Sequence, residues 1–364
     1  MRSTFGICAL LAGLGSVSLF AADASATWNA KAAGGYLDER QAWWQGWPMA
    51  ARDHGTFCIS CHTAAPYALG RQALRFAMGE TGPSITEHKL LDNVTKRVMM
   101  WNEVEPFYSD KDRGAPKTAE SRGTESVLNA LILINYDSRS GGLSKATQTA
   151  FDNMWALQLK DGDSKGALTW LNFHNEPWEA EDSQYYGATL AAIAVGLTPM
   201  DYQSEPAVKA NIALLRQYLQ KGYQAQSPVL RTMVLWASSK MPGLLTKEQQ
   251  KSAIDSLFTL QKEDGGWSMT DVVGTWKRHD GTPLETKSDA YATALISYAL
   301  EQVGVKHDQS GLKRGLDWLV ANQNPTAGSF PAYSLNKNRD LTSDAGRFMS
   351  DAATAYSVLA LTAK

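Results

Sequence analysis

The sequence predicts an all-α protein, an (α/α)6 toroid or barrel in which inner and outer helices alternate along the chain. Two kinds of helical pattern repeat at a spacing of about 50 to 60 residues, which is typical of an array of helical pairs. The first kind is small and apolar nearly all round, as in helices buried inside a protein, and the second is amphipathic, as in an outer layer. The alternation of apolar and polar residues that indicates a strand is scarce.

The segments with the inner pattern are rich in Ala, Ser, Thr and Leu, and several begin with an acidic residue. They are residues 62–78, 124–135, 182–196, 229–240, 289–303 and 351–362, and the acidic residues are Glu125, Asp182, Asp289 and Asp351. Because all inner helices of such a toroid run in the same direction, we expect these carboxylates at one end of the barrel. Capping of the helix N-terminus is the first role expected of them, and contact with a ligand is the second.

The segments with the outer pattern often end in Gln. They are residues 86–102, 145–159, 205–221, 246–261 and 310–323. Residues 36–50, which contain Trp43, Trp44 and Trp47, supply either the sixth outer helix or a lid. The long connections contain Pro and Gly, and loops of such length are usually functional. They are residues 103–123, 162–181, 264–288 and 324–350.

The first residues predict export. An uninterrupted run of small and apolar residues, Gly6 to Phe20, follows the basic Arg2, and an Ala-x-Ala pattern occurs within residues 21–26. This is the pattern of a secretory signal peptide over residues 1–26. We therefore expect one toroid domain over residues 27–364, located in the periplasm or secreted, without a later apolar run of the ~18 residues that span a bilayer.

The charge balance excludes some partners. The chain has 35 Lys and Arg against 37 Asp and Glu, a formal net charge of −2. A protein that tracks nucleic-acid phosphates or an acidic membrane carries an excess of basic residues. We expect no nucleic-acid partner.

The two cysteines of the mature chain stand together in Cys58-Ile-Ser-Cys61-His62. Cys-x-x-Cys-His is the pattern of covalent c-type haem attachment: the thiols form thioethers with the porphyrin, and the histidine is the proximal iron ligand. A thioredoxin-like redox pair would follow a strand, and a structural zinc site would need a second pair of ligands. A disulfide across this short loop would be strained. The segment 54–78 is accordingly predicted to carry one haem c.

The distal side of the iron is left open by the sequence. Met99 and Met100 could supply a thioether, and His54, His88, His174 and His279 could supply an imidazole. An open or water-ligated iron is a further alternative, and the choice separates electron transfer from chemistry at the metal.

Some of the repeated segments resemble a known family. Gln-Lys-Glu-Asp-Gly-Gly-Trp at 261–267, a weaker copy at 158–170, and the Asp-x-x-x-Thr-Ala starts at Asp289 and Asp351 are similar to the QW repeats of squalene–hopene cyclases and related prenyltransferases. The likeness covers roughly residues 120–364 and implies a toroid. The Asp-x-Asp-Asp motif with which those cyclases protonate an alkene does not occur here, so terpene cyclisation is not expected.

The predicted toroid and the predicted haem segment together place the haem at the barrel mouth, because Cys58 to His62 immediately precede the first inner helix. Arg52, Arg71 and Arg75 are placed to pair with haem propionates, and Tyr67 could line the pocket together with tyrosines of other inner helices. The segment His174-Asn-Glu-Pro-Trp-Glu179 is predicted to be a loop that points to the same mouth. The candidate catalytic residues are His174, as distal ligand or acid/base group, and Asp182 and Asp289.

The function predicted first is that of an exported c-type haem protein that transfers electrons to or from a periplasmic redox partner. The alternative is a haem-dependent oxidase or peroxidase that acts on an apolar small molecule, such as an isoprenoid, in the toroid cavity. A lyase or glycosidase on the same type of barrel would need a pair of carboxylates in a sugar-binding cleft. The 12 Trp residues are compatible with such a cleft.

Overall fold

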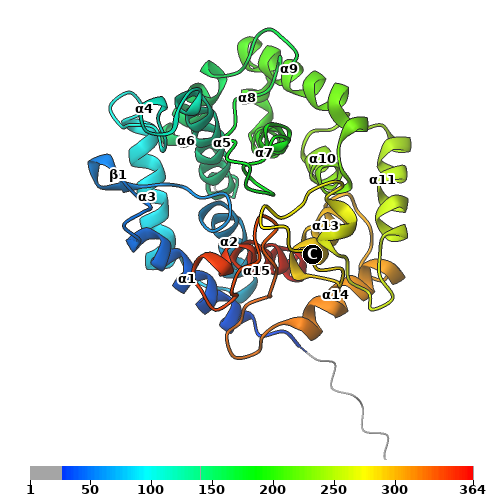
Figure 1. Ribbon diagram of the computed structural model, residues 1–364. Helices are drawn as coiled ribbons and strands as arrows, with labels where there is room; N and C mark the ends of the chain where they lie inside the picture. Colours follow the sequence, from blue (N-terminus) through cyan, green and yellow to red (C-terminus); the bar gives the residue numbers. More distant parts are fainter. Residues whose placement is uncertain (1–26, 140, 364) are drawn as a thin grey trace, which may run out of the picture.

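The computed structural model describes residues 27–139 and 141–363, and the predicted signal peptide lies outside these residues. Helices pair around a central axis in two concentric layers (Figure 1). The predicted all-α toroid is confirmed. In the part of the chain that the structure describes, no helix combines the length and apolar character needed to cross a membrane.

The inner layer is a closed ring. Each inner helix packs against the next one along the chain, and the last one packs against the first. The inner helices are α2 (Ala64–Met78), α5 (Lys117–Asp137), α7 (Ser183–Gly196), α10 (Pro228–Lys240), α13 (Ala290–Gln302) and α15 (Phe348–Thr362). Their small residues allow close approach: a Cβ added at Gly70 of α2 would lie 2.7 Å from the backbone oxygen of Ala355 in α15.

The outer layer consists of amphipathic helices whose N-termini are capped by side chains in several cases. They are α1 (Ala30–Gly46), α3 (Ile85–Met99), α6 (Lys145–Ala156), α9 (Pro206–Gly222), α11 (Lys247–Thr259) and α14 (Ser310–Asn322). Ser84 with Glu87, and Thr246 with Gln249, form capping boxes that fix where α3 and α11 begin. The Trp-rich segment is the sixth outer helix, α1, which packs on α2, α3 and α15.

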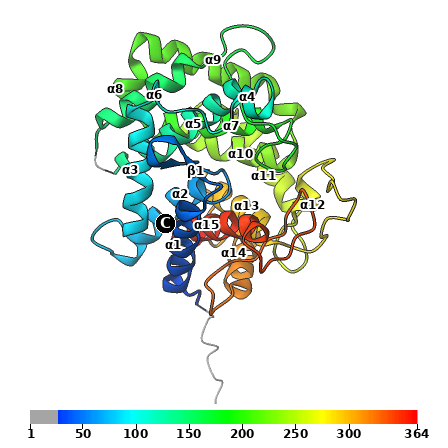
Figure 2. The same cartoon turned by 60° about the vertical axis from the view of Figure 1, so that its left-hand side comes forward.

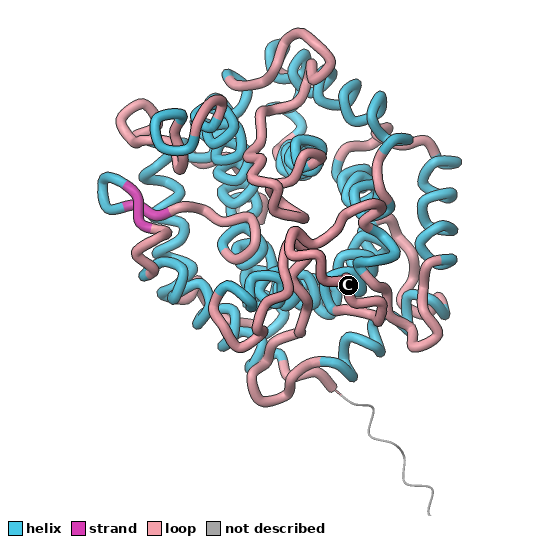
Figure 3. Tube along the Cα trace, in the orientation of Figure 1, coloured by secondary structure: helices cyan, strands magenta, loops and turns pink. Residues whose placement is uncertain are grey.

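The remaining elements are short. The α-helical turns are α4 (Asp110–Arg113), α8 (Met200–Ser204) and α12 (Met269–Val272), and the 3-10 turns are η1 (Asp53–Gly55), η2 (Tyr223–Ala225) and η3 (Ala345–Arg347). Strands β1 (Ala51–Arg52) and β2 (Thr56–Phe57) form a small antiparallel hairpin before α2, with Ala51 opposite Phe57. Long loops cross the middle of the ring (Figure 3), and the connection that contains α12 projects from one side of the molecule (Figure 2).

The Gln residues that end three of the outer helices make the same kind of contact. The side-chain amide of each one donates to a carbonyl of its own following loop and to a carbonyl at or in the next outer helix. Gln158 binds Gly166 and Asn211, Gln261 binds Gly265 and Gly311, and Gln323 binds Gly328 and Asn29. The repeated Gln therefore links three pairs of consecutive outer helices: α6 with α9, α11 with α14, and α14 with α1.

The middle of the ring is filled rather than open. Trp178, at one mouth, contacts Tyr291 of α13, which contacts Tyr356 of α15, and Tyr356 contacts Trp236 of α10, with ring centroids 5.7 to 6.2 Å apart. All four side chains are buried. These aromatic rings separate a cavity at one mouth of the toroid from a cavity at the other.

Candidate active site

One cavity lies where the N-terminal ends of the inner helices meet. Its volume is about 150 Å³, and its walls come from segments that precede inner helices: the residues before α2, the loop before α7, and the loop and first residues of α15. The lining includes the side chains of Cys61, His62, Glu176, Trp178, Glu179 and Phe348.

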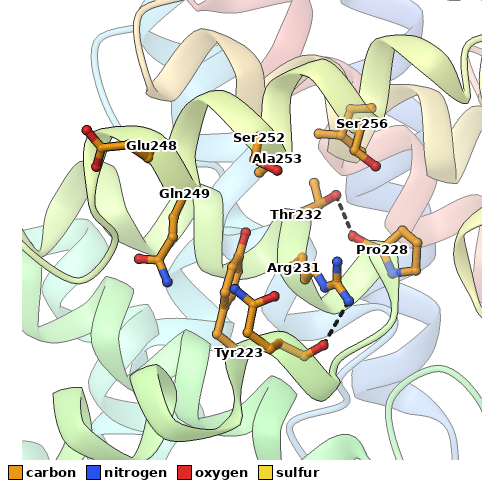
Figure 4. A pocket seen from close by; sticks show the side chains of 11 residues that line it. Tyr223, Pro228, Arg231, Thr232, Glu248, Gln249, Ser252, Ala253 and Ser256 are labelled. Carbon is orange, nitrogen blue, oxygen red and sulfur yellow. Dashed lines mark hydrogen bonds between the residues drawn. The ribbon is translucent and has the colours of Figure 1, made fainter.

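Other cavities are larger, among them one of about 390 Å³ between α1, the β1–β2 hairpin and α3. One of about 410 Å³ lies at the opposite mouth, where the C-terminal ends of the inner helices meet. Another, of about 290 Å³, lies between α10 and α11 (Figure 4), where Arg231 and Thr232 donate to backbone carbonyls of Gln224 and Pro228. We place the candidate active site in the 150 Å³ cavity because several titratable side chains with perturbed pKa values face it together.

The loop before α7 brings two carboxyl groups to this cavity. The backbone N–H groups of Asn175 and Glu179 donate to each other's carbonyl oxygens at 3.0 and 2.9 Å, which closes a tight hairpin. The indole N–H of Trp170 donates to the carbonyl of Trp178 at 2.7 Å and anchors the hairpin to the protein interior. Glu176 and Glu179 therefore have defined positions at the cavity wall.

The two carboxyl groups have different environments. Burial raises the pKa of Glu179 to about 7, while a hydrogen bond from the Asn175 side chain and the charge of Lys117 oppose the rise. A carboxyl group with this pKa holds a proton for much of the time at neutral pH and can donate it. The Glu176 Oε2 atom lies 3.3 Å from Nε2 of His279, and the Glu176 side chain is 13% exposed.

The imidazole of His62 lies in an aromatic cage. It stacks on Phe348 with ring centroids 3.8 Å apart, meets Trp44 edge to face at 4.9 Å, and lies 5.9 Å from Trp178. Burial, with a smaller contribution from the charge of Arg40, lowers the pKa of His62 to about 3. The ring is therefore neutral at physiological pH.

The thiols of Cys58 and Cys61 are buried beside this cage. Burial raises the pKa of Cys58 to about 12 and the pKa of Cys61 well above its ordinary value. Because the thiolate is the reactive form of cysteine, both groups are unreactive at neutral pH in this fold.

The residues around His62 do not fit a porphyrin as they are packed here. The adjoining cavity measures about 150 Å³, whereas pockets for drug-sized ligands start at about 300 Å³. The rings of Phe348, Trp44 and Trp178 take up the space around the imidazole. Within residues 27–139 and 141–363, no group of three or more His, Cys, Asp or Glu side chains is arranged to hold a metal ion. Covalent haem at Cys58 and Cys61 stays a prediction of the sequence.

None of the candidates for the distal iron position is among the residues that line the cavity, although His279 contacts Glu176 of its wall. Met99 and Met100 stand at the C-terminal end of α3, and the side chain of Met99 is 51% exposed. His174 is an exposed loop residue at a positive φ of 54°, with Nδ1 3.9 Å from a carboxylate oxygen of Glu181. Its carbonyl oxygen accepts a hydrogen bond from His279.

The side chains predicted to bind haem propionates, or to line the haem pocket, are occupied by other contacts. The hydroxyl of Tyr67 donates to Asp38 at 2.6 Å. The guanidinium of Arg71 binds Asp38 at 3.2 Å and Glu80 at 2.8 Å. Arg52 donates to backbone carbonyls in and just before β1. The contacts of Tyr67 and Arg71 connect α2 to α1 and to the start of the α2–α3 loop.

Asp182 and Asp289 stand at the starts of inner helices α7 and α13. Asp289 is a helix cap, since its two carboxylate oxygens accept from the backbone N–H groups of Ala292 at 2.9 Å and Met269 at 2.6 Å. Burial raises the pKa of Asp289 to about 6 and also raises the pKa of Asp182. Neither side chain lines the 150 Å³ cavity.

Glu125 and Asp351 do not begin their helices as predicted, because α5 starts at Lys117 and α15 at Phe348. Both carboxylates bind buried arginines instead. Asp351 accepts from Nε of Arg40 at 2.8 Å, and Glu125 accepts from Nε of Arg97 at 2.5 Å. Burial raises the pKa of Asp351, and the guanidinium of Arg40 opposes that rise. These ion pairs join α15 to α1 and α5 to α3.

Sequence reasoning missed Glu176 and Glu179 as site residues. The sequence predicts that their loop reaches the mouth of the barrel, but it names His174 of that loop as the candidate catalytic residue. The available signal was a pair of glutamates around Trp178 in a long loop before an inner helix.

Comparison with known proteins adds information on the fold. No family model and no curated protein sequence matches the chain. Among solved structures, a polysaccharide lyase matches with a TM-score of 0.54 and 11% identity over 92% of this chain and 96% of its own. A glycosidase matches with a TM-score of 0.52 and 13% identity over 92% of this chain and 97% of its own.

A third structure is described as a possible member of the GH105 family from Klebsiella pneumoniae. It matches with a TM-score of 0.50 and 12% identity over 92% of this chain and of its own. At these identities the likeness is one of fold, and it extends over nearly the whole toroid.

The comparisons overturn two predictions. The similarity to squalene–hopene cyclases and prenyltransferases with a cytochrome motif is wrong as an identification, because the matched structures are glycosidases and a polysaccharide lyase. Electron transfer through haem, and haem-dependent oxidation of an apolar substrate, are wrong for the same reason. The structure agrees with this correction, because the space beside His62 does not fit a porphyrin. The chain has the all-α toroid fold that carbohydrate-active enzymes of both kinds share with it.

Proposed function

We propose that this protein is a carbohydrate-active enzyme that hydrolyses a glycosidic bond at the 150 Å³ cavity. The observation that carries the proposal is the pair of carboxyl groups, Glu176 and Glu179, on one hairpin at the wall of an aromatic-lined cavity. The glycosidases and the polysaccharide lyase that share the toroid support the proposal by analogy of fold.

The chemistry uses the different environments of the two groups. Glycosidases use one carboxylic acid to protonate the leaving oxygen and one carboxylate to activate water or to attack the sugar. Glu179, with its pKa of about 7, is the proton donor. Glu176, beside His279, is the carboxylate that takes the proton from the attacking water. The glycosidic bond breaks, the proton of Glu179 goes to the leaving oxygen, and the hydroxyl of water goes to the sugar.

The cavity also has side chains suited to a sugar. Trp178 and Phe348 supply apolar faces, and Asn175, Asn336 and Arg339 supply hydrogen-bond donors. The volume of about 150 Å³ suits a single ring-sized unit rather than a chain of several. We therefore propose that the enzyme removes one unit from the end of a saccharide. Export by the predicted signal peptide is part of the same proposal.

The test is a panel of aryl glycosides and plant and bacterial polysaccharides, with release of reducing ends as the readout. We expect Glu179→Gln and Glu176→Gln each to lower kcat about 100-fold or more, because a general acid or base contributes at least this factor. Glu181→Gln is the control, because the Glu181 side chain lies in the same loop and is 84% exposed.

The outcomes separate the mechanisms. Products that carry an ultraviolet-absorbing double bond would show that the enzyme is a lyase. In that case the proposed hydrolysis would be wrong. Full activity of Glu179→Gln, with a wild-type circular dichroism spectrum, would remove Glu179 from the mechanism and overturn the proposal.

A further inference from the structure

We infer that His62 is a positioning residue of the cavity: its Nε2 atom accepts a hydrogen bond from a sugar hydroxyl, and Thr63 and Asp351 hold the ring in the tautomer that leaves Nε2 free. This inference rests on the proposed function, since it assigns the ligand at that cavity. It also gives the Cys-x-x-Cys-His segment a role that requires no porphyrin.

The tautomer follows from a chain of hydrogen bonds. The hydroxyl of Thr63 has one proton, which it donates to Oδ2 of Asp351 at 2.8 Å. Nδ1 of His62 lies 2.8 Å from the same hydroxyl oxygen. Because the Thr63 proton is already used, Nδ1 of His62 must be the donor. The proton of the neutral ring is therefore on Nδ1, and Nε2 carries a lone pair.

Asp351, at the end of this series of hydrogen bonds, is held by two further donors. Oδ1 of Asp351 accepts from Nε of Arg40 and from the hydroxyl of Tyr36, both at 2.8 Å. Arg40 is permanently charged and only 2% exposed, as is Asp351, so Asp351 acts as a carboxylate acceptor. These hydrogen bonds join α1 and α15 to the residues before α2. With Asp351 ionised by its pairing with Arg40, their donors and acceptors have one arrangement.

The orientation of the ring is fixed as well. Phe348 covers one face of the imidazole, and Trp44 meets it edge to face. His62 and Glu179 both line the same cavity. A sugar bound there presents hydroxyl donors, and an acceptor in the same cavity as Glu179 orients the sugar ring relative to the proton donor.

Nitrogen NMR of the mature protein with labelled histidine tests the tautomer without any substrate. We expect the Nδ1–H form of His62 in the wild type and in Thr63→Ser, which keeps the hydroxyl. In Thr63→Val, which has nearly the same shape but no hydroxyl, the preference should be lost. A wild-type His62 in the Nε2–H form would overturn the inference.

Kinetics on an aryl glycoside hydrolysed by the wild type test the positioning role. His62→Gln places a side-chain oxygen near the position of Nε2, and we expect it to retain KM within about threefold. His62→Phe keeps an aromatic ring without an acceptor, and KM should rise about tenfold with a smaller change in kcat, as expected for one lost hydrogen bond. A folded His62→Phe variant with wild-type KM would overturn the inference.

Failure of the proposed function has a different signature. If the wild type hydrolyses no saccharide while NMR shows the Nδ1–H tautomer, the proposed glycosidase activity is wrong and the hydrogen-bond chain stands. An absorption spectrum with a Soret band, from protein made in cells able to attach haem c, would show that His62 serves a porphyrin and would overturn the positioning role directly.

Discussion

Glu179 illustrates how one residue acquires chemistry from its surroundings. A glutamate on an exposed loop is ionised at neutral pH, but this one faces a small enclosed cavity in which burial raises its pKa to about 7. The same loop contains Glu181, whose side chain is 84% exposed. Two residues along the chain thus separate an acid from an ordinary surface carboxylate, because the hairpin between Asn175 and Glu179 turns one inward.

The pH dependence of the proposed activity follows from this pKa. Glu179 must be protonated to act as the acid, so kcat/KM should fall as the pH rises through about 7. The profile of kcat/KM against pH measures this limb directly. In Glu181→Gln the limb should stay in place, and an activity that is flat from pH 6 to 9 would be inconsistent with Glu179 as the donor.

At the scale of elements, the Gln residues at the ends of outer helices show what the repeated pattern does. The side-chain amide of Gln158 donates to Gly166 at 3.0 Å and to Asn211 at 2.9 Å, and the residue is 3% exposed. Gln261 and Gln323 repeat the arrangement after α11 and α14. The repeated Gln residues therefore stabilise contacts within the outer layer. This structural role explains why they occur in a chain without a cyclase motif.

Removal of one such contact should weaken the fold. Gln158→Ala removes the donor to the buried carbonyl of Gly166 and the link to the half-buried carbonyl of Asn211 in α9. We expect the free energy of unfolding to fall by about 1 to 3 kcal/mol. Urea denaturation followed by circular dichroism gives this value. Gln224→Ala, at an exposed glutamine, is the matched control and should change stability by less than ~0.5 kcal/mol. Equal effects at the two positions would contradict a stabilising role for the Gln158 hydrogen bonds.

At the scale of the whole molecule, the ring closes through contacts between the two ends of the chain. The helix α15 packs on α2 and α1, and the pair Arg40–Asp351 spans this junction with both side chains 2% exposed. The ends of the described chain are thereby locked together through one buried charge pair.

Breaking this pair should destabilise the toroid as a whole. Asp351→Asn leaves the buried guanidinium of Arg40 with Asp344, 2.9 Å away and 47% exposed, as its charge partner. Breaking a buried pair outright costs about 3 to 5 kcal/mol, and we expect a loss at or below the lower end of this range. Thermal and urea unfolding monitor the loss. The exposed pair of Arg347 and Glu39, 4.0 Å apart, is the comparison, and Glu39→Gln should have little effect. An equally mild effect of Asp351→Asn would show that the ends are held by packing alone.

The sequence by itself determined the architecture of this protein. Helical periodicity, the small apolar character of inner segments such as 182–196 and the terminal Gln residues are properties of neighbouring residues, so they can be recognised along the chain. The predicted segments overlap all twelve helices of the two layers. Even the segment 36–50, for which a lid was an alternative, lies largely within the outer helix α1.

Only the tertiary structure decided the content of the barrel and the identity of the candidate site. Glu176, Glu179 and His62 meet through loops whose positions depend on contacts between residues far apart in sequence, such as Thr63 with Asp351. Cys58 and Cys61 have the spacing of a haem site, but packing of Trp44 and Phe348 around His62 fills the space beside it. Local spacing cannot report such packing, because the volume around a side chain is set by every segment that surrounds it.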